Sequence, residues 1–70
     1  MLSDAEITTA VKTKLLADKL LGGLKIDVDT DKGVVTHKGT VRSEAERAAA
    51  VKIAKDTMGV KSVVDKLAVK

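Results

Sequence analysis

The sequence lacks cysteine, proline and every aromatic side chain, although it is 70 residues long. Without cysteine it has no disulfide framework and no thiolate metal site. The missing aromatic residues argue against binding of nucleic acid by base stacking, and they remove the usual anchors at a membrane interface. Because ten valines and seven leucines are the main large apolar residues, the core must be aliphatic.

Long apolar runs and a strong charge excess are also missing. Charged residues make up 33% of the chain, and no apolar run approaches the roughly 20 residues that cross a bilayer. Thirteen basic and ten acidic residues give a net charge of +3, a smaller excess than dedicated DNA binders carry. No basic start followed by an apolar stretch is visible, so we expect no signal peptide within this sequence.

Two stretches carry the signals of helices. Each begins with the S-x-x-E pattern of a capping box, at Ser3 and at Ser43. The first helix is expected to run to about Leu20, and the second to Met58 before Gly59. The predicted inward positions, at helical spacing, are Ile7, Ala10, Val11 and Leu15, then Ala50, Ile53, Ala54 and Thr57.

Three stretches have the alternating pattern of strands. The first centres on residues 26–30, a turn at residues 31–33 follows, and residues 34–41 return to form a hairpin. Gly39 predicts a bulge or a close approach by another element. Residues 60–69 form the last strand, with Val63, Leu67 and Val69 on one face. The order α-β-β-α-β predicts one α/β (α+β sandwich) domain over residues 1–70, with a three-stranded mixed sheet and both helices packed on one face.

These motifs together resemble the BON domain, named after bacterial osmotically induced and nodulation proteins. The hairpin segment Gly33-Val34-Val35-Thr36-x-x-Gly39-Thr40-Val41 is the most specific piece, with the later Gly59-Val60. The resemblance covers roughly residues 4–69. The other matching pieces are Asp4-x-x-Ile7, Val11, Leu15, Ile26-x-Val28, Ala50-x-x-Ile53-Ala54 and Val63-x-x-x-Leu67-x-Val69.

The resemblance implies a non-enzymatic role, with binding of phospholipid membranes or of other envelope components. It also implies a periplasmic or cell-envelope location, although some BON proteins are cytoplasmic. This chain departs from the family in having one copy of the domain, where two copies or a fused second domain are common. It also departs at His37, where leucine is common, and at Asp65, where asparagine is common.

We do not expect the carboxylates and hydroxyls of the chain to form a catalytic or metal-binding site. Asp27, Asp29 and Asp31 resemble the start of a calcium loop, but glycine falls at position seven and Lys38 at position twelve. Period two instead places all three on the solvent face of a strand. Both helix-capping serines are already used, and a single histidine for all the candidate nucleophiles disfavours an organised triad. We therefore expect no catalytic residue, no cofactor and no metal.

His37 is the only histidine, and alternation turns it toward the face of Val35 and Val41. The simpler interpretation is a histidine near the sheet edge with one nitrogen hydrogen-bonded. The functional interpretation is a pH-sensitive element. Burial predicts a lowered pKa, whereas a carboxylate partner across the sheet, such as Asp65, would raise it.

A candidate membrane surface lies on the first helix. Leu16 is nine residues from Ile7, which places it on the opposite side of the helix. Exposed leucines framed by lysines can enter lipid headgroups while the lysines meet anionic phosphates. In the competing interpretation the helix ends early, and Leu20, Leu21 and Leu24 fold under to close the core. The candidate lipid-binding residues are Lys12, Lys14, Leu16, Lys19, Leu20, Lys52 and Lys55.

A second class of function is a protein-interaction or assembly module within a larger envelope protein. It would use an exposed sheet edge, or the strip of small residues on the second helix formed by Ala45, Ala48, Ala49 and Val51. The partner is then another envelope protein domain rather than anionic phospholipid headgroups. Nucleic-acid binding is disfavoured, because the G-x-x-G loop of KH domains is missing as well as the aromatic residues.

The aspartate cluster gives a first prediction. Millimolar calcium should leave the melting temperature unchanged. A bound ion at a hundredfold excess over its dissociation constant would stabilise the fold by about 2.7 kcal/mol. A rise of several degrees in a thermal melt would show that the aspartates do form a site.

Overall fold

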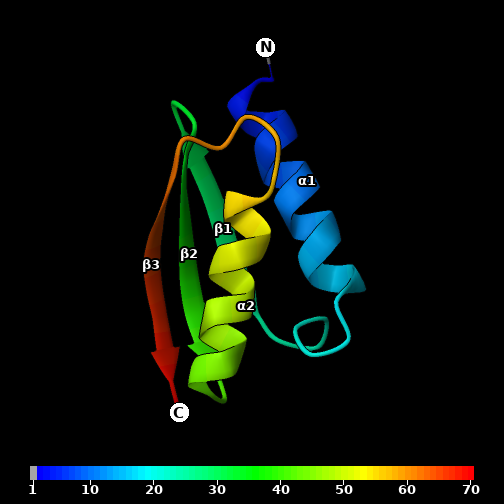
Figure 1. Ribbon diagram of the computed structural model, residues 1–70, viewed down its shortest axis with the longest axis vertical. Coiled ribbons are helices and arrows are strands. Elements are labelled where there is room, and N and C mark those ends of the chain that lie inside the picture. Colours follow the sequence, from blue (N-terminus) through cyan, green and yellow to red (C-terminus); the bar gives the residue numbers. More distant parts are fainter. Residues whose placement is uncertain (1) are drawn as a thin grey trace.

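The computed structural model describes residues 2–70 and confirms the predicted α+β class and element order. Both helices lie on one face of the sheet, α1 beside β1 and α2 across β2 and β3 (Figure 1). The elements are α1 (Asp4–Ala17), β1 (Ile26–Asp31), β2 (Val34–Val41), α2 (Glu44–Lys55) and β3 (Ser62–Val69).

The sheet is mixed, and β2 is its central strand. The strand order is β1-β2-β3, with β1 antiparallel and β3 parallel to β2. The register places Val28 and Asp65 on either side of His37. The helix α2 lies in the chain between β2 and β3, so it forms the crossover that connects these two neighbouring parallel strands.

Both helices end earlier than the sequence predicts. The first ends at Ala17 rather than near Leu20, because Asp18 is extended and its Oδ1 accepts hydrogen bonds from the N–H groups of Leu20 (2.8 Å) and Leu21 (3.1 Å). A side-chain acceptor that competes for backbone N–H groups ends a helix. The second ends at Lys55 rather than at Met58, because Thr57 leaves the helical hydrogen-bond pattern. Its hydroxyl donates to the carbonyl of Ile53, and its backbone N–H donates to the carbonyl of Ala54, three residues back.

The capping serines behave as predicted, but only one capping box is complete. The Ser3 hydroxyl accepts from the Glu6 N–H, and Glu6 accepts in return from the Ser3 N–H. Ser43 caps α2 in the same way, whereas Glu46 turns back to accept from the Arg42 N–H and side chain instead. Glu46 is consequently buried, and the hydrogen bonds from Arg42 lower its pKa.

The core lies between the helices and the inner face of the sheet, and its hydrophobic residues are all aliphatic. The buried polar residues among those that the structure describes are Thr30, His37, Glu46 and Thr57. The inward stripes predicted for α2 and β3 are confirmed, and Ala50 and Ala54 are fully buried where α2 lies on the sheet. At Gly39, φ is +137° and a Cβ atom would overlap the carbonyl oxygen of Lys25. Gly39 forms the last pair of the β1–β2 register, with Ile26, and the β2–β3 register runs through it without a break. Gly39 therefore marks a close approach and not a bulge. The buried hydrophobic residues are Ile7, Val11, Leu15, Leu21, Val28, Val35, Val41, Ala50, Ala54 and Leu67.

Asp4 connects the start of α1 to the β1–β2 turn. Its two carboxylate oxygens accept from the N–H groups of Lys32 (2.8 Å) and Gly33 (3.0 Å). Both turn residues have positive φ, 52° at Lys32 and 82° at Gly33, as a two-residue type I′ hairpin turn requires. Because a positive φ is costly at lysine, these hydrogen bonds help to hold the turn in its conformation.

Replacement of Asp4 by alanine should lower the free energy of unfolding by about 1–3 kcal/mol, because two backbone donors lose a charged acceptor. Urea denaturation measures this difference. Asp4→Asn keeps one acceptor oxygen and should lose less. Asp27→Ala, which removes an exposed carboxylate of β1, is the matched control and should stay within about 0.5 kcal/mol of wild type. Equal losses for Asp4→Ala and Asp27→Ala would contradict this role.

Candidate functional site

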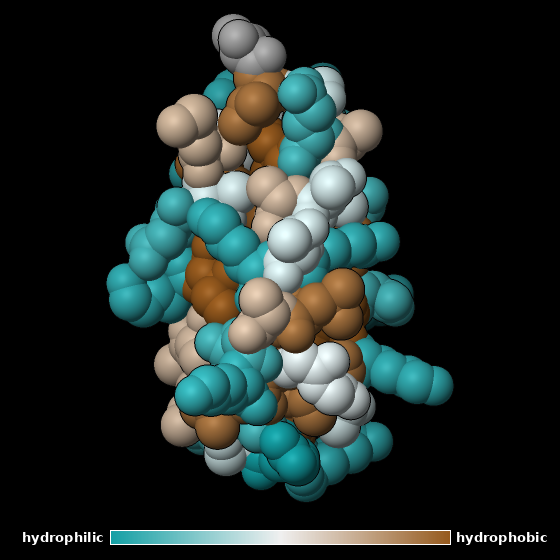
Figure 2. Space-filling model, turned by 90° about the vertical axis from the view of Figure 1, so that its right-hand side faces the viewer, coloured by the Kyte–Doolittle hydropathy of each residue, from teal (hydrophilic) through white to brown (hydrophobic). Residues whose placement is uncertain are grey.

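Two leucines are exposed at the C-terminal end of α1. Leu16 is 71% exposed and Leu20 is 58% exposed. Figure 2 shows hydrophobic side chains lying among hydrophilic ones on the lower half of the α1 side of the molecule. An exposed pair of large aliphatic residues is a greater cost for this chain than for a larger protein, because a small domain buries little apolar surface.

The segment after α1 places successive leucines on opposite sides. Asp18 fixes the backbone of Leu20 and Leu21, so that Leu21 is 1% exposed while Leu20 points outward. Leu24 is partly buried against the core. The interpretation in which all three fold under is therefore correct for Leu21 and Leu24 and wrong for Leu20. Arg42 also anchors this segment, since its Nη2 donates to the Leu20 carbonyl (3.3 Å).

Asp18 and Arg42 are the residues that the sequence analysis missed at this site. In an Asx turn the side chain of an aspartate accepts a hydrogen bond from the backbone N–H two residues further on. Because this signal is local, the role of Asp18 was visible in the sequence. The contact of Arg42 spans 22 residues, and nothing local indicates it.

A small apolar hollow lies beside Leu16. It has a volume of about 130 Å³, with Lys12 at its lining and aliphatic side chains elsewhere. The side chains come from α1, from the following segment and from the start of β1. Its lining residues are Lys12, Leu15, Leu16, Leu21, Leu24 and Ile26.

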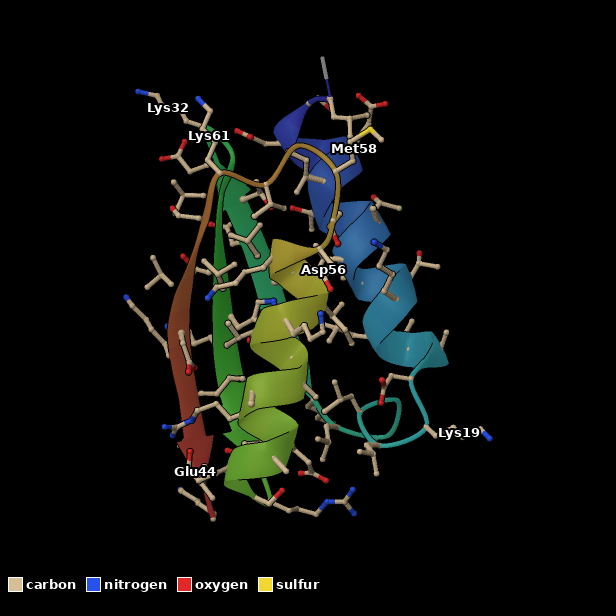
Figure 3. The ribbon with its side chains drawn as sticks, viewed as in Figure 1. Lys19, Lys32, Glu44, Asp56, Met58 and Lys61 are labelled. Carbon is tan, nitrogen blue, oxygen red and sulfur yellow. The ribbon has the colours of Figure 1, made fainter. Side chains whose placement is uncertain are left out.

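The structure divides the predicted lysines into three groups. Lys12 and Lys19 are exposed and belong to the same end of α1 as the two leucines, and Lys19 points away from the body of the molecule (Figure 3). We call Lys12, Leu16, Lys19 and Leu20 the leucine–lysine patch. Lys14 turns toward α2, where its Nζ donates to the Thr57 hydroxyl (3.2 Å).

Lys52 and Lys55 lie elsewhere, in a groove between α2 and β3. Lys52 forms an ion pair with Asp56 (2.7 Å), which raises the pKa of Lys52 and lowers that of Asp56. The predicted set of lysines is thus not one surface. This α2–β3 groove has a volume of about 510 Å³ and is lined by Glu44, Arg47, Ala48, Val51, Lys52, Lys55, Asp56 and Asp65.

His37 is fully buried in the middle of the sheet. It shares the inner face with Val35 and Val41, as predicted, but β2 is not an edge strand. Neither Nδ1 nor Nε2 has a hydrogen-bond partner among residues 2–70, so the expected hydrogen bond is wrong. Burial lowers the pKa of His37 below its ordinary value of 6.5, and the opposing effect of Asp65 is the smaller one.

The three aspartates of β1 are exposed on alternate positions of the strand, as predicted. Within residues 2–70, no group of three or more histidine, cysteine or carboxylate side chains is arranged to hold a metal ion. Neither helix in this part of the chain is long and apolar enough to span a bilayer.

Comparison with known proteins identifies relatives of the whole described chain. The model of the BON domain matches residues 3–70. The chain is also similar to osmotically-inducible protein Y of Escherichia coli (strain K12), with 44% identity over 69 residues. That alignment covers 99% of this chain and 34% of the relative, so the chain spans about a third of the relative's length.

The buried His37 predicts that acid destabilises the fold. Its folded pKa lies below 6.5, so the unfolded chain binds more protons once the pH falls below about 6.5. The free energy of unfolding should therefore drop on acidification, by up to about 1.4 kcal/mol per pH unit. Urea denaturation between about pH 5 and pH 7, above the range of the carboxylates, isolates this group.

His37→Leu is the test variant for this slope. It should remove the pH dependence in that window and add about 1 kcal/mol at neutral pH, because an aliphatic side chain then fills the position. A slope of opposite sign in wild type, or the same slope in His37→Leu, would contradict the assignment.

Proposed function

The chain belongs to the BON domain family, and we propose that it is a non-enzymatic module of an osmotic-stress-related envelope protein that binds anionic phospholipid surfaces. The name of the Escherichia coli relative supports the link to osmotic stress. The observation that carries the membrane proposal is the exposure of Leu16 and Leu20 at one end of α1, beside Lys12 and Lys19.

The leucine–lysine patch has the composition of a surface that enters the headgroup region. Side chains such as Leu16 and Leu20 gain free energy when they leave water for the acyl boundary. Each lysine near an anionic surface adds about 1 kcal/mol at moderate salt. The hollow beside Leu16 extends the apolar surface inward, and Lys12 at its lining sets a positive charge beside that apolar surface.

The catalytic alternative has little support in the residues present. Both Ser3 and Ser43 hydroxyls accept backbone hydrogen bonds at helix starts. His37 is enclosed in the core and forms no hydrogen bond with either serine. These side chains have structural roles, which supports a binding module. A periplasmic or envelope location belongs to the same proposal.

One observation favours the second candidate, docking of another protein domain. The small residues Ala48 and Val51 line the α2–β3 groove, where a partner helix could approach closely. The groove carries both positive and negative side chains, so it is less suited to an anionic membrane than the leucine–lysine patch is.

Vesicle co-sedimentation tests the membrane proposal. The domain should bind phosphatidylglycerol vesicles and not phosphatidylcholine vesicles, and binding should weaken as salt rises, because exposed charges are screened within about 10 Å at 0.1 M. Lys12→Gln with Lys19→Gln should weaken binding by about tenfold or more, since each lysine is worth about 1 kcal/mol. Leu16→Gln with Leu20→Gln should weaken it further at every salt concentration.

Met58→Gln is the matched control for the leucines. Met58 is 78% exposed, and it lies at the opposite end of the molecule from Lys19 (Figure 3). The corresponding control for the lysines is Lys52→Gln with Lys55→Gln, on the α2–β3 groove. Equal binding to both vesicle types, no binding at low salt, or equal losses in the control variants would refute the proposal.

A further inference from the structure

The strand β3 forms one free edge of the sheet. It has eight residues and pairs only with β2 in the order β1-β2-β3. An unpaired edge offers its N–H and C=O groups to any other extended chain, and natural proteins block such edges. The two edges of this sheet are blocked in different ways.

The opposite edge, β1, has its own protection. It is only six residues long, and its alternate positions carry exposed aspartates. Short length and charge both discourage pairing with another strand. By contrast, β3 carries only Asp65 and Lys66 as charged residues, and Val64 is 40% exposed on its outer face.

The backbone of Leu67 is capped by side chains on the free side of β3. The N–H of Lys70 bonds to Val41 of β2, and successive N–H groups of a strand point to opposite sides. The N–H of Leu67 therefore faces away from β2. It donates to Asp65 Oδ1 (2.9 Å), and the Leu67 carbonyl accepts from Arg47 Nη2 (2.8 Å).

Asp65 and Arg47 thus supply the acceptor and the donor that a neighbouring strand would supply. The two side chains are also held together, since Arg47 Nε lies 3.7 Å from Asp65 Oδ2. Arg47 is fixed from its own helix by Glu44, whose Oε1 lies 3.4 Å from Nη1. We call the pair of Asp65 and Arg47 the latch.

We infer that the latch prevents β3 from pairing, edge to edge and antiparallel, with the β3 of a second copy of this chain. A two-fold axis through such a pair would continue the sheet and place the two α2 helices antiparallel. The small residues Ala48 and Val51 line the groove on that side, which allows close approach. The acidic first turn of each α2 would then lie toward the basic last turn of the other, so the charges are complementary.

The test is self-association of a variant without the latch. In sedimentation experiments the wild type should remain monomeric, and Arg47→Ala with Asp65→Ala should associate at least tenfold more tightly. Lys52→Ala with Asp56→Ala is the matched control, because it removes one base and one acid from the same groove. That control has no contact with the β3 backbone and should behave as wild type.

A third substitution shows whether the edge itself is responsible. Val64→Lys adds a charge on the outer face of β3 and should return the latch-free variant to the monomer, because an edge lysine opposes strand pairing. The inference is overturned if the folded latch-free variant stays monomeric, or if it associates equally with Val64→Lys.

Amide hydrogen exchange decides the matter if the double variant does not fold. In dilute Asp65→Ala, the Leu67 N–H should exchange about tenfold faster than in wild type, because it loses its acceptor. Asp65→Asn keeps an acceptor oxygen and should retain slow exchange. Unchanged exchange of Leu67 in Asp65→Ala would show that Asp65 does not close the edge.

Discussion

The packing of two helices onto the inner face of the sheet, whose central strand is β2, is the interaction on which the rest of this domain depends. Val35, His37 and Val41 of that strand are all fully buried. Because no aromatic side chain is available, the layers must lie close together to exclude water. Ala50 and Ala54 allow this on α2. At the native packing density of protein interiors, even a small change in side-chain volume affects the packing and the stability of the fold.

This arrangement also decides which side chains are left for function. Once Ile7, Val11 and Leu15 face the sheet, Leu16 must face solvent, since neighbouring helix residues are about 100° apart. The core could have gained roughly 1.5–3 kcal/mol from a buried leucine. The fold does not require leucine, rather than a polar residue, at the exposed positions 16 and 20, where Lys12 and Lys19 flank Leu16 in sequence.

Several of the charged residues that the sequence offers for binding are used within the domain. Lys14 is bound to Thr57, Lys52 to Asp56, and Arg47 to the backbone of β3. The positive charge directed outward near α1 therefore comes from fewer lysines than the sequence offers. His37 is buried without a hydrogen bond, and Asp65 lies opposite it on the neighbouring strand β3. Asp65 is thus close to the core and to the sheet edge at once.

The element order, the helix starts and the faces of the strands could all be predicted from the amino-acid sequence. These depend on local signals: a serine hydroxyl reaches an N–H three residues on, and alternation fixes which side a residue faces. The limits of β2 followed in the same way, whereas the sequence left a bulge or a close approach open at Gly39. The helix ends were predicted less accurately, because the side chains of Asp18 and Thr57 compete with the helical hydrogen bonds before the predicted end of each helix is reached.

The folded structure was needed to show how residues distant in sequence are brought together. It placed β2 in the centre, so that His37 is buried rather than near an edge. It separated Lys52 and Lys55 from the lysines of α1, and it bound Asp4 to a turn 28 residues away. Such contacts depend on the packing of whole elements against each other, whereas periodicity and capping depend on neighbours along the chain. That difference is why the fold could be predicted, whereas the grouping of the candidate surface residues could be predicted only in part.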